Sequence, residues 1–298
     1  MLATPLGLSG IPVEHLKRPF LARQSCFAGG IVNRSVGRWA PELVALPGMA
    51  NKYYVTDGAR ADGVRQLFSS IAPQYDRIND LQSFGLHRIW KRRMRRLAAV
   101  GEETFALDLC CGTGDVALGM AGNGARVIGI DFVFPMLERA RWRVQRAGEK
   151  GGRVSLIQGD ALAIPCPAGA FDVVTMSYGL RNLADFEAGL REVCRVLKPG
   201  GRLVILDFGK PENRLWRSVY FSYLRLVVPV FGRVFCGDSD AYRYILESLN
   251  AYPARSGIEK MLSGNGFGSV ESSDLLGGVM HLTVAEKHGQ TASLFADL

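Results

Sequence analysis

Short apolar runs alternate with amphipathic stretches from Phe105 to Phe208, and this alternation constrains the fold more than any other feature of the chain. The stretches between the runs, such as 135–147 and 185–197, carry apolar residues at helical spacing. Strands that alternate with helices form βαβ units, which build a parallel sheet covered by helices on both faces. The predicted strands are 105–110, 126–131, 154–159, 171–177 and 202–208, followed by closing strands at 268–276 and 279–287. We therefore expect an α/β fold with a mostly parallel, doubly wound sheet of seven strands.

The regions that flank this alternation differ in character. Helical patterning covers 64–80 and 87–100, and an aromatic, arginine-rich stretch at about 213–250 interrupts the alternation, which indicates a helical lid inserted into the fold. Residues 1–48 contain few acids and no sustained period, so we expect disorder there. A simpler hypothesis is that Met49 is the true start and that the first 48 residues are an over-extended reading frame. The predicted domain then spans 49–298.

Composition narrows the class of protein. The chain has 298 residues, 48% of them hydrophobic, and a formal charge of +8. No stretch approaches the roughly 18 to 20 uninterrupted apolar residues that a membrane-spanning helix needs. We therefore expect a cytoplasmic protein, with peripheral contact at the inner face of the membrane as the alternative. The six cysteines form no C-x-x-C pattern and the four histidines show no zinc spacing, so no metal site is expected.

The stretch 107-LDLCCGTGD-115 joins the first predicted strand to a helix through a glycine-containing turn. Glycine allows the backbone to turn sharply and to approach a ligand closely. The turn differs from the dinucleotide signature because Ala117 stands where a third glycine belongs. We expect Cys110 and Cys111 to finish the buried strand as small apolar residues.

Three later positions indicate which kind of ligand this turn binds. Asp131 ends the second strand, where an acid commonly binds two ribose hydroxyls. Asp160, in 159-GDA-161, follows the third strand, and Ser177 ends the fourth. Each alone is more often a turn or capping residue. Together, with 198-KPGG-201 before the fifth strand, they look like a class I S-adenosylmethionine-dependent methyltransferase.

Longer blocks resemble one family of such enzymes. The stretch 75-YDRINDLQSFGLHRIW-90 closely resembles the signature of the ubiquinone/menaquinone biosynthesis C-methyltransferases, and 177–182, 194–208 and 238–248 look like their other blocks. The resemblance extends from about residue 64 to 287. One departure is 207-DFGK-210, where many members have Glu-x-Ser, so that Gly209 lacks a hydroxyl group.

The resemblance implies a donor site, a reaction and partners. It implies that S-adenosylmethionine is contacted by Thr113, Asp131, Asp160, Ala161 and Ser177, and residue chemistry adds Gly112 and Gly114 through the loop and Tyr75 as an aromatic face toward the sulfonium. The implied reaction is C-methylation of a prenylated quinol, either demethylmenaquinol or 2-methoxy-6-polyprenyl-1,4-benzoquinol. The resemblance also leaves a homodimer open.

Catalysis of this reaction needs groups that reach the ring oxygens. Arg181 and Asn182 follow the fourth strand, and a guanidinium can stabilise developing phenolate charge. An arginine is a poor proton acceptor, so a water held by this pair, His87 or Asp240 stays open as the acceptor. The alternative is a structural Arg–Asn pair that supports the loop.

The predicted insertion has two interpretations as well. Its aromatic residues and four arginines suit both an apolar substrate and an anionic lipid surface, and they equally suit packing on the sheet. The aromatic residues are Trp216, Tyr220, Phe221, Tyr223, Phe231 and Phe235.

Two other functions compete with quinol methylation. The basic run 88–96 suits an RNA methyltransferase, although it is more simply a solvated helix face, and the chain lacks the accessory motifs of that class, so no nucleic-acid partner is expected. A non-catalytic S-adenosylmethionine-binding assembly protein would show a damaged ligand loop, whereas 112-GTG-114 is intact.

Overall fold

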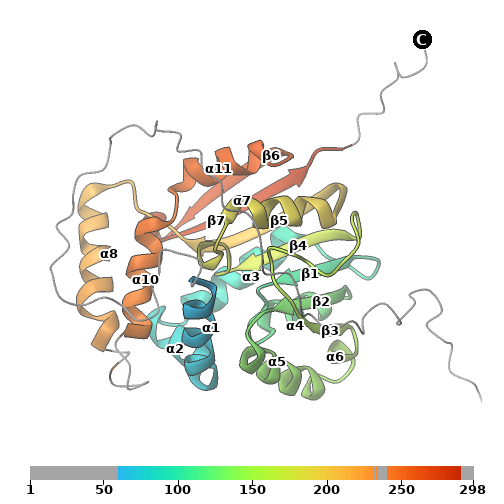
Figure 1. The fold of residues 1–298 in the computed structure, drawn as a ribbon, viewed down its shortest axis with the longest axis horizontal. Helices are drawn as coiled ribbons and strands as arrows, with labels where there is room; N and C mark the ends of the chain where they lie inside the picture. The colour runs from blue at the N-terminus through green and yellow to red at the C-terminus, as the bar shows by residue number, and fades with distance from the viewer. Residues whose placement is uncertain (1–59, 231–232, 234–239, 290–298) are drawn as a thin grey trace, which may run out of the picture. The chain divides into compact units, whose positions relative to one another are not determined.

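A computed structural model of the chain describes residues 60–230, 233 and 240–289, all of which belong to one compact unit (Figure 1). Of residues 240–243 only the backbone is described. The predictions for residues 1–48, both disorder and an over-extended reading frame, concern positions outside the described residues.

Seven strands form one sheet in the order β3-β2-β1-β4-β5-β7-β6. All neighbouring strands from β3 to β5 are parallel, and β7 runs antiparallel to both β5 and β6. The strands are β1 (Phe105–Leu109), β2 (Arg126–Asp131), β3 (Val154–Gln158), β4 (Phe171–Ser177), β5 (Leu197–Phe208), β6 (Phe267–Leu275) and β7 (Met280–Lys287). The predicted fold class is confirmed.

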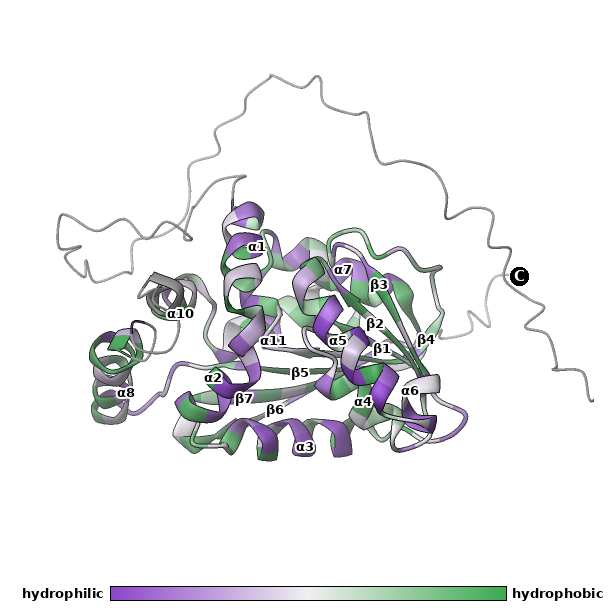
Figure 2. Cartoon of the chain, turned by 90° about the horizontal axis from the view of Figure 1, so that it is seen from below, coloured by the Kyte–Doolittle hydropathy of each residue, from purple (hydrophilic) through white to green (hydrophobic). Residues whose placement is uncertain are grey.

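Helices cover both faces of this sheet, as the connections require. The chain steps from β1 to β2 to β3 in one direction, and right-handed crossovers place α4 (Asp115–Ala121) and α5 (Phe134–Arg146) on the same face. It steps from β4 to β5 in the opposite direction, so α7 (Phe186–Val196) lies on the other face. The short α6 (Glu149–Gly152) packs against α4 and α5, α3 (Leu86–Ala98) packs on β4 and β5, and α11 (Arg255–Gly264) packs on β6. The central strands are hydrophobic, whereas α3 presents hydrophilic residues on its outer face (Figure 2).

The predicted helix over 64–80 is broken in two. α1 (Arg60–Ile71) ends before Pro73, a 3-10 turn η2 (Ala72–Gln74) follows, and α2 begins at Tyr75 and ends at Gln82. Proline has no backbone N–H to donate within a helix, so the chain changes direction there. The break places Tyr75 at the start of a new helix.

Two of the helices that the structure describes, α8 (Arg214–Leu226) and α10 (Asp240–Ala251), lie in the predicted insertion. They pack against each other beside the carboxyl end of the sheet (Figure 1). Tyr220 and Leu224 of α8 are buried, whereas Leu215 and Leu226 are largely exposed. Over the described ranges, no helix combines the length and the apolarity needed to cross a bilayer.

Candidate active site at the carboxyl edge of the sheet

A cleft opens where β1, β2 and β4 end, and most of the predicted donor-binding residues line it. Its walls come from these strand ends, from α1 and α2, and from the loops that follow β3 and β4. The predicted residues on the wall are Tyr75, Gly112, Asp131, Asp160, Ala161, Ser177 and Asn182. They converge because parallel strands present their carboxyl ends at one edge of the sheet.

The loop after β1 is built on left-handed backbone. The strand ends at Leu109, so the prediction that Cys110 and Cys111 finish it is wrong: Cys110 has a φ of 56° and already belongs to the turn. Gly112 and Gly114 have φ values of 54° and 77°. Both thiols have a pKa raised well above the usual value, chiefly because they are buried. They stay protonated, in line with their predicted apolar character.

Asp131 connects this loop to the second strand. Its Oδ2 accepts a hydrogen bond from the Gly112 amide at 2.8 Å, and its Oδ1 accepts one from the Val133 amide at 2.9 Å. Burial raises the pKa of its carboxyl group to about 6, and these backbone hydrogen bonds oppose the rise. The carboxylate is therefore fixed in the cleft wall with further lone pairs available to a ligand.

The remaining wall residues differ in whether their polar atoms already have a hydrogen-bond partner within the protein. Asp160 is exposed, and its Oδ1 accepts a hydrogen bond from the Leu162 amide at 2.9 Å, while Ala161 is buried beside it. The Oγ of Ser177 is buried and has no hydrogen-bond partner among the described residues. Buried hydroxyls are rarely left unpaired, so this one suits a polar ligand in the cleft.

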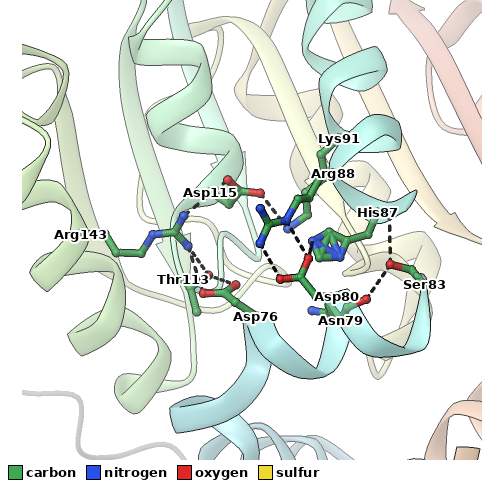
Figure 3. A network of polar contacts seen from close by, with 10 residues as sticks. All are labelled: Asp76, Asn79, Asp80, Ser83, His87, Arg88, Lys91, Thr113, Asp115 and Arg143. Carbon is green, nitrogen blue, oxygen red and sulfur yellow. Dashed lines mark hydrogen bonds and ion pairs between the residues drawn. The ribbon is translucent and has the colours of Figure 1, made fainter. Parts of the chain in front are cut away.

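Thr113 and Gly114 lie off the cleft wall. The Thr113 hydroxyl donates to Asp76 Oδ1 at 2.9 Å and accepts from an Arg143 Nη at 3.1 Å (Figure 3). Gly114 is the N-cap residue of α4, and a Cβ there would lie 3.2 Å from the Ala140 Cβ. The side chain of Thr113 thus fastens the loop to α2 and α5, and a ligand contact by Thr113 or Gly114 stays a prediction.

Lys91 is a residue whose position the sequence reasoning missed. Lys91 belongs to the basic run 88–96, for which a solvated helix face is the simpler prediction, yet it is buried. Its Nζ lies 3.2 Å from Asp115 Oδ2 (Figure 3). The ammonium group also lies 5.9 Å from the centre of the Tyr178 ring. Helical spacing could have revealed it, because Met94 and Ala98 stand three and seven residues further along the same buried face.

A second, apolar cavity lies next to the cleft. It is lined by α2, α3 and α8 together with the ends of β5 and β7, and its volume is about 260 Å³. Tyr178 lines both the cleft and this cavity. The lining is mainly aromatic and aliphatic, with Phe84, Leu86, Trp90, Phe208, Trp216, Val219, Tyr220, Tyr223, Leu224 and Met280 among its members. Its size is many times that of one water molecule, which suits a ring-sized apolar ligand.

Arg181 forms a buried ion pair. One Nη donates to the Tyr178 carbonyl at 2.9 Å and lies 3.3 Å from Asp207 Oδ1, and the guanidinium lies 4.6 Å from the centre of the Phe208 ring. Arg181 lines neither the cleft nor the apolar cavity; it faces a small cavity between them that Tyr75 and Tyr178 also line. Its Nε is buried and has no hydrogen-bond partner among the residues that the structure describes. Burial raises the pKa of the Asp207 carboxyl group, and Arg181 opposes this.

Asn182 lies at the border of the same region. Its Nδ2 donates to the Tyr178 carbonyl at 2.8 Å, and its Oδ1 accepts from the Tyr244 hydroxyl at 3.2 Å. The two residues chosen for catalysis are therefore both tied to Tyr178 and sit where the cleft meets the cavities. Whether they also bind substrate stays a prediction.

Gly209, the departure in 207-DFGK-210, has a steric explanation. A Cβ at this position would collide with the His281 ring and lie 2.5 Å from the Gly278 carbonyl oxygen. Because β7 occupies that space with His281, this chain has no room for a side chain at residue 209.

Across residues 60–230, 233 and 240–289, no three His, Cys, Asp or Glu side chains are arranged to hold a metal ion. The expectation that the reaction needs no metal stays a prediction.

Comparison with known proteins decides the family. The model of the ubiE/COQ5 methyltransferase family matches residues 55–287. The chain belongs to this family. It is 44% identical to the demethylmenaquinone methyltransferase of Thermus thermophilus over 74% of the chain and 100% of that protein. It is 38% identical to the ubiquinone/menaquinone biosynthesis C-methyltransferase UbiE of Azotobacter vinelandii, over 76% of the chain and 91% of that protein.

A solved structure supports the fold independently. The crystal structure of an S-adenosylmethionine-dependent methyltransferase from Aquifex aeolicus matches 74% of the chain and 98% of its own, with a TM-score of 0.51 and 18% identity. At this identity the match concerns the fold alone. The predicted resemblance to the quinone-biosynthesis methyltransferases is confirmed by the family match.

Proposed function

We propose that the protein transfers a methyl group from S-adenosylmethionine to a ring carbon of a prenylated quinol, demethylmenaquinol or a polyprenyl benzoquinol. The observation that carries this proposal is the apolar cavity that adjoins the strand-edge cleft across Tyr178. A prenylated ring needs such a surface, whereas a nucleic acid does not. Both relatives named above are quinone-biosynthesis methyltransferases, which agrees with the proposal.

The cleft suits the methyl donor. Asp131 and Asp160 offer carboxylate oxygens, Ser177 offers an unpaired buried hydroxyl, and the Gly112 backbone lines the wall. Tyr75 presents its ring to the same space, where an aromatic face stabilises a sulfonium cation. When bound, S-adenosylmethionine supplies an electrophilic methyl group. The chain's own task is to align the acceptor carbon and to exclude water.

Arg181 and Asn182 would then hold the oxygens of the acceptor ring. Arg181 lines the small cavity between the cleft and the apolar cavity, and its Nε–H has no partner among the described residues. A fixed N–H group in a buried site stabilises negative charge that develops on a phenolic oxygen. The pair with Asp207 keeps the guanidinium in place without consuming this donor.

Quinone analysis of a deletion strain tests the function. Loss of the gene should cause accumulation of demethylmenaquinone or of an unmethylated benzoquinol precursor, and the accumulating species names the ring. The wild-type chain should restore the profile, whereas Asp131→Ala should not. An unchanged quinone profile in the deletion strain would contradict the proposal.

Exposed apolar residues of α8 and of the turn between α2 and α3 suit contact with membrane lipid. Phe84 and Leu215 are 80% and 77% exposed, and Leu226 is 67% exposed. Arg214 and Arg225 are exposed on the same helix, α8. Apolar residues mixed with arginines are typical of a segment that rests on an anionic bilayer, from which a prenylated substrate would enter.

Vesicle flotation tests this contact. The double substitution Leu215→Asp and Leu226→Asp should abolish flotation with acidic vesicles but leave turnover of a short-chain, water-soluble quinol within about twofold. Trp142→Asp on α5, which changes another exposed apolar residue, should leave flotation unchanged. Equal flotation of all three proteins would exclude docking through α8. A homodimer stays a prediction that sedimentation analysis can test.

A further inference from the structure

Four residues in the wall of the apolar cavity each carry a buried polar atom that has no hydrogen-bond partner within the described part of the chain. The atoms are Nδ2 of Asn79, Nε2 of Gln82, Nδ1 of His87 and the hydroxyl of Tyr220. Buried polar atoms are almost always paired, because an unpaired one costs about 1–3 kcal/mol. Their concentration in one apolar cavity indicates a ligand with oxygen atoms on an otherwise apolar body.

We propose that His87 is the catalytic proton acceptor for a hydroxyl group of the acceptor ring and that Asp80 is the residue that positions it. The proposal rests on the proposed function and adds the group that removes the proton. His87 lies on α3, and its side chain is only 7% exposed. Asp80 lies on α2, the helix that precedes α3 across the turn at 83–85.

The geometry assigns different tasks to the two ring nitrogens of His87. Nε2 lies 3.4 Å from Asp80 Oδ1, and Asp80 is itself held by a hydrogen bond from Arg88 Nε at 2.7 Å (Figure 3). A carboxylate beside one ring nitrogen favours the tautomer with the proton on that nitrogen. Nδ1 then carries the lone pair, and it is the nitrogen without a partner. A ring hydroxyl in the cavity would donate to it.

His87 has the charge state that a proton acceptor needs. Its pKa is lowered, chiefly by burial and next by the Lys91 ammonium, whereas Asp80 and Asp115 oppose the shift and Arg88 adds to it weakly. Tyr220 and Tyr223 of α8 line the same cavity. The imidazole is therefore neutral at pH 7 and free to accept a proton.

Proton transfer to His87 precedes methyl transfer. Nδ1 takes the proton of the ring hydroxyl, and the electron pair of the broken O–H bond stays on the oxygen and delocalises onto the neighbouring ring carbon. That carbon forms the new bond to the methyl group, whose bond to sulfur breaks with both electrons left on sulfur. The methylated carbon then loses its hydrogen to water as a proton, and the imidazolium returns its proton to the oxygen. The net products are a methylated quinol, S-adenosylhomocysteine and one proton.

Arg181 cannot perform this step. A guanidinium is already protonated at neutral pH and has no lone pair that could accept a further proton. Arg181 is also paired with Asp207. It serves as a hydrogen-bond donor to an oxygen, whereas His87 accepts the proton from one.

His87→Gln tests the assignment directly, because glutamine keeps a polar side chain but cannot take up a proton. With a quinol substrate and saturating methyl donor, kcat should fall by about 10²–10³-fold. The wild-type rate should fall as the pH drops through a value below about 6.5, the ordinary pKa of histidine. In His87→Gln the inflection that reports the imidazole should vanish. The remaining, slower rate should rise continuously with pH, because only ionisation of the ring hydroxyl itself then supplies the nucleophile. A wild-type kcat and acid limb in the variant would overturn the proposal.

Three controls keep the outcome interpretable. Donor affinity by calorimetry and the thermal midpoint should match the wild type, since His87 does not line the donor cleft. His288→Gln, a change at an exposed histidine, should keep wild-type turnover. If the wild-type protein methylates no quinol, the proposed function fails; if both it and His87→Gln methylate it equally, only the role of His87 fails.

Asp80→Asn provides a second test that leaves His87 in place. Because Asp80 raises the pKa of His87, the amide should move the acid limb to lower pH and lower the plateau kcat by about tenfold. A merely structural role for Asp80 would leave the position of the acid limb unchanged, and that result would overturn the positioning role.

Discussion

Cys110 and Gly112, which stand two residues apart in the loop after β1, adopt the same left-handed backbone conformation at different energetic cost. Cys110 and Gly112 have φ values of 56° and 54°, a region that glycine adopts freely and other residues rarely. A Cβ on Gly112 would meet no atom within 4 Å, so the protein itself leaves space for a side chain there. Since Gly112 lines the cleft, that space belongs to the ligand.

Gly112→Val should weaken S-adenosylmethionine binding by at least about 100-fold. Valine is β-branched and strained at positive φ, and its side chain would project into the cleft. The matched variant Cys110→Gly with Cys111→Ala should bind the donor within about threefold of the wild type, because the thiols act as small apolar groups. Calorimetric titration measures both affinities. Wild-type affinity in Gly112→Val would refute this account of the loop.

Asp108 makes the stability of the protein depend on pH. Burial raises the pKa of its carboxyl group to about 7, against hydrogen bonds from Thr175 and the Ala117 amide and the charge of Lys91. An aspartate in an unfolded chain titrates near about 3.9. Between these values the native state binds more protons than the unfolded state, so the free energy of unfolding falls as the pH rises.

Asp108→Asn should remove this contribution to the pH dependence of the free energy of unfolding. Between about pH 5 and pH 7, the wild type should lose up to about 1.4 kcal/mol of unfolding free energy per pH unit relative to the variant. Urea denaturation of both proteins at the two pH values measures the difference. Parallel pH dependences would show that Asp108 titrates normally.

At the scale of elements, the 3-10 turn η3 (Leu180–Asn182) is anchored to the end of β5. Asp207 accepts hydrogen bonds from the Arg181 amide at 3.1 Å and from its guanidinium at 3.3 Å. Both side chains are buried, so the loss of one partner leaves the other unpaired in a region of low dielectric.

Arg181→Met should lower the free energy of unfolding by about 3–5 kcal/mol, and the double variant with Asp207→Leu should recover part of that loss. Turnover should stay low in the double variant, because the proposed donor to the ring oxygen is absent from it. Denaturation and turnover measured on the same samples separate the two roles. Normal turnover in the stable double variant would leave Arg181 with a structural role alone.

Most elements were predictable because buried parallel strands are short apolar runs with polar or glycine-containing ends. The predicted β2 and β4 agree with the observed bounds, whereas β5 begins at Leu197, before the expected residue 202. The difference arises because 198-KPGG-201 continues the strand through an irregularity in its pairing with Phe171 and Val173, with Gly200 at a φ of 74°. The local sequence pattern does not reveal how β5 pairs with β4.

The cleft wall was predictable for the residues that end strands, since topology alone brings Asp131 and Ser177 to one edge. The direction in which a side chain points was not predictable from the sequence. Thr113 follows the end of β1 at the same edge of the sheet, but its hydroxyl is directed to Asp76 and Arg143. Lys91 differs, because it stands in a basic run but its helical spacing from Met94 and Ala98 places it on their buried face.

At the scale of the whole molecule, the sheet provides the donor cleft and the added helices provide the acceptor cavity. α2, α3 and α8 enclose an apolar cavity that the sheet does not contain by itself, and Tyr178 borders both spaces. A methyl group and a ring carbon can therefore meet at this border, with His87 on the acceptor side and Asp131 on the donor side.

The most direct test is a reaction with purified protein and S-adenosylmethionine that carries a deuterated methyl group. Demethylmenaquinol and the unmethylated benzoquinol precursor are supplied in separate reactions, and the products are examined by mass spectrometry. The account predicts a deuterated methyl group on a ring carbon of at least one quinol, dependent on Asp131 and Ser177. Donor binding without ring methylation of either quinol would contradict it.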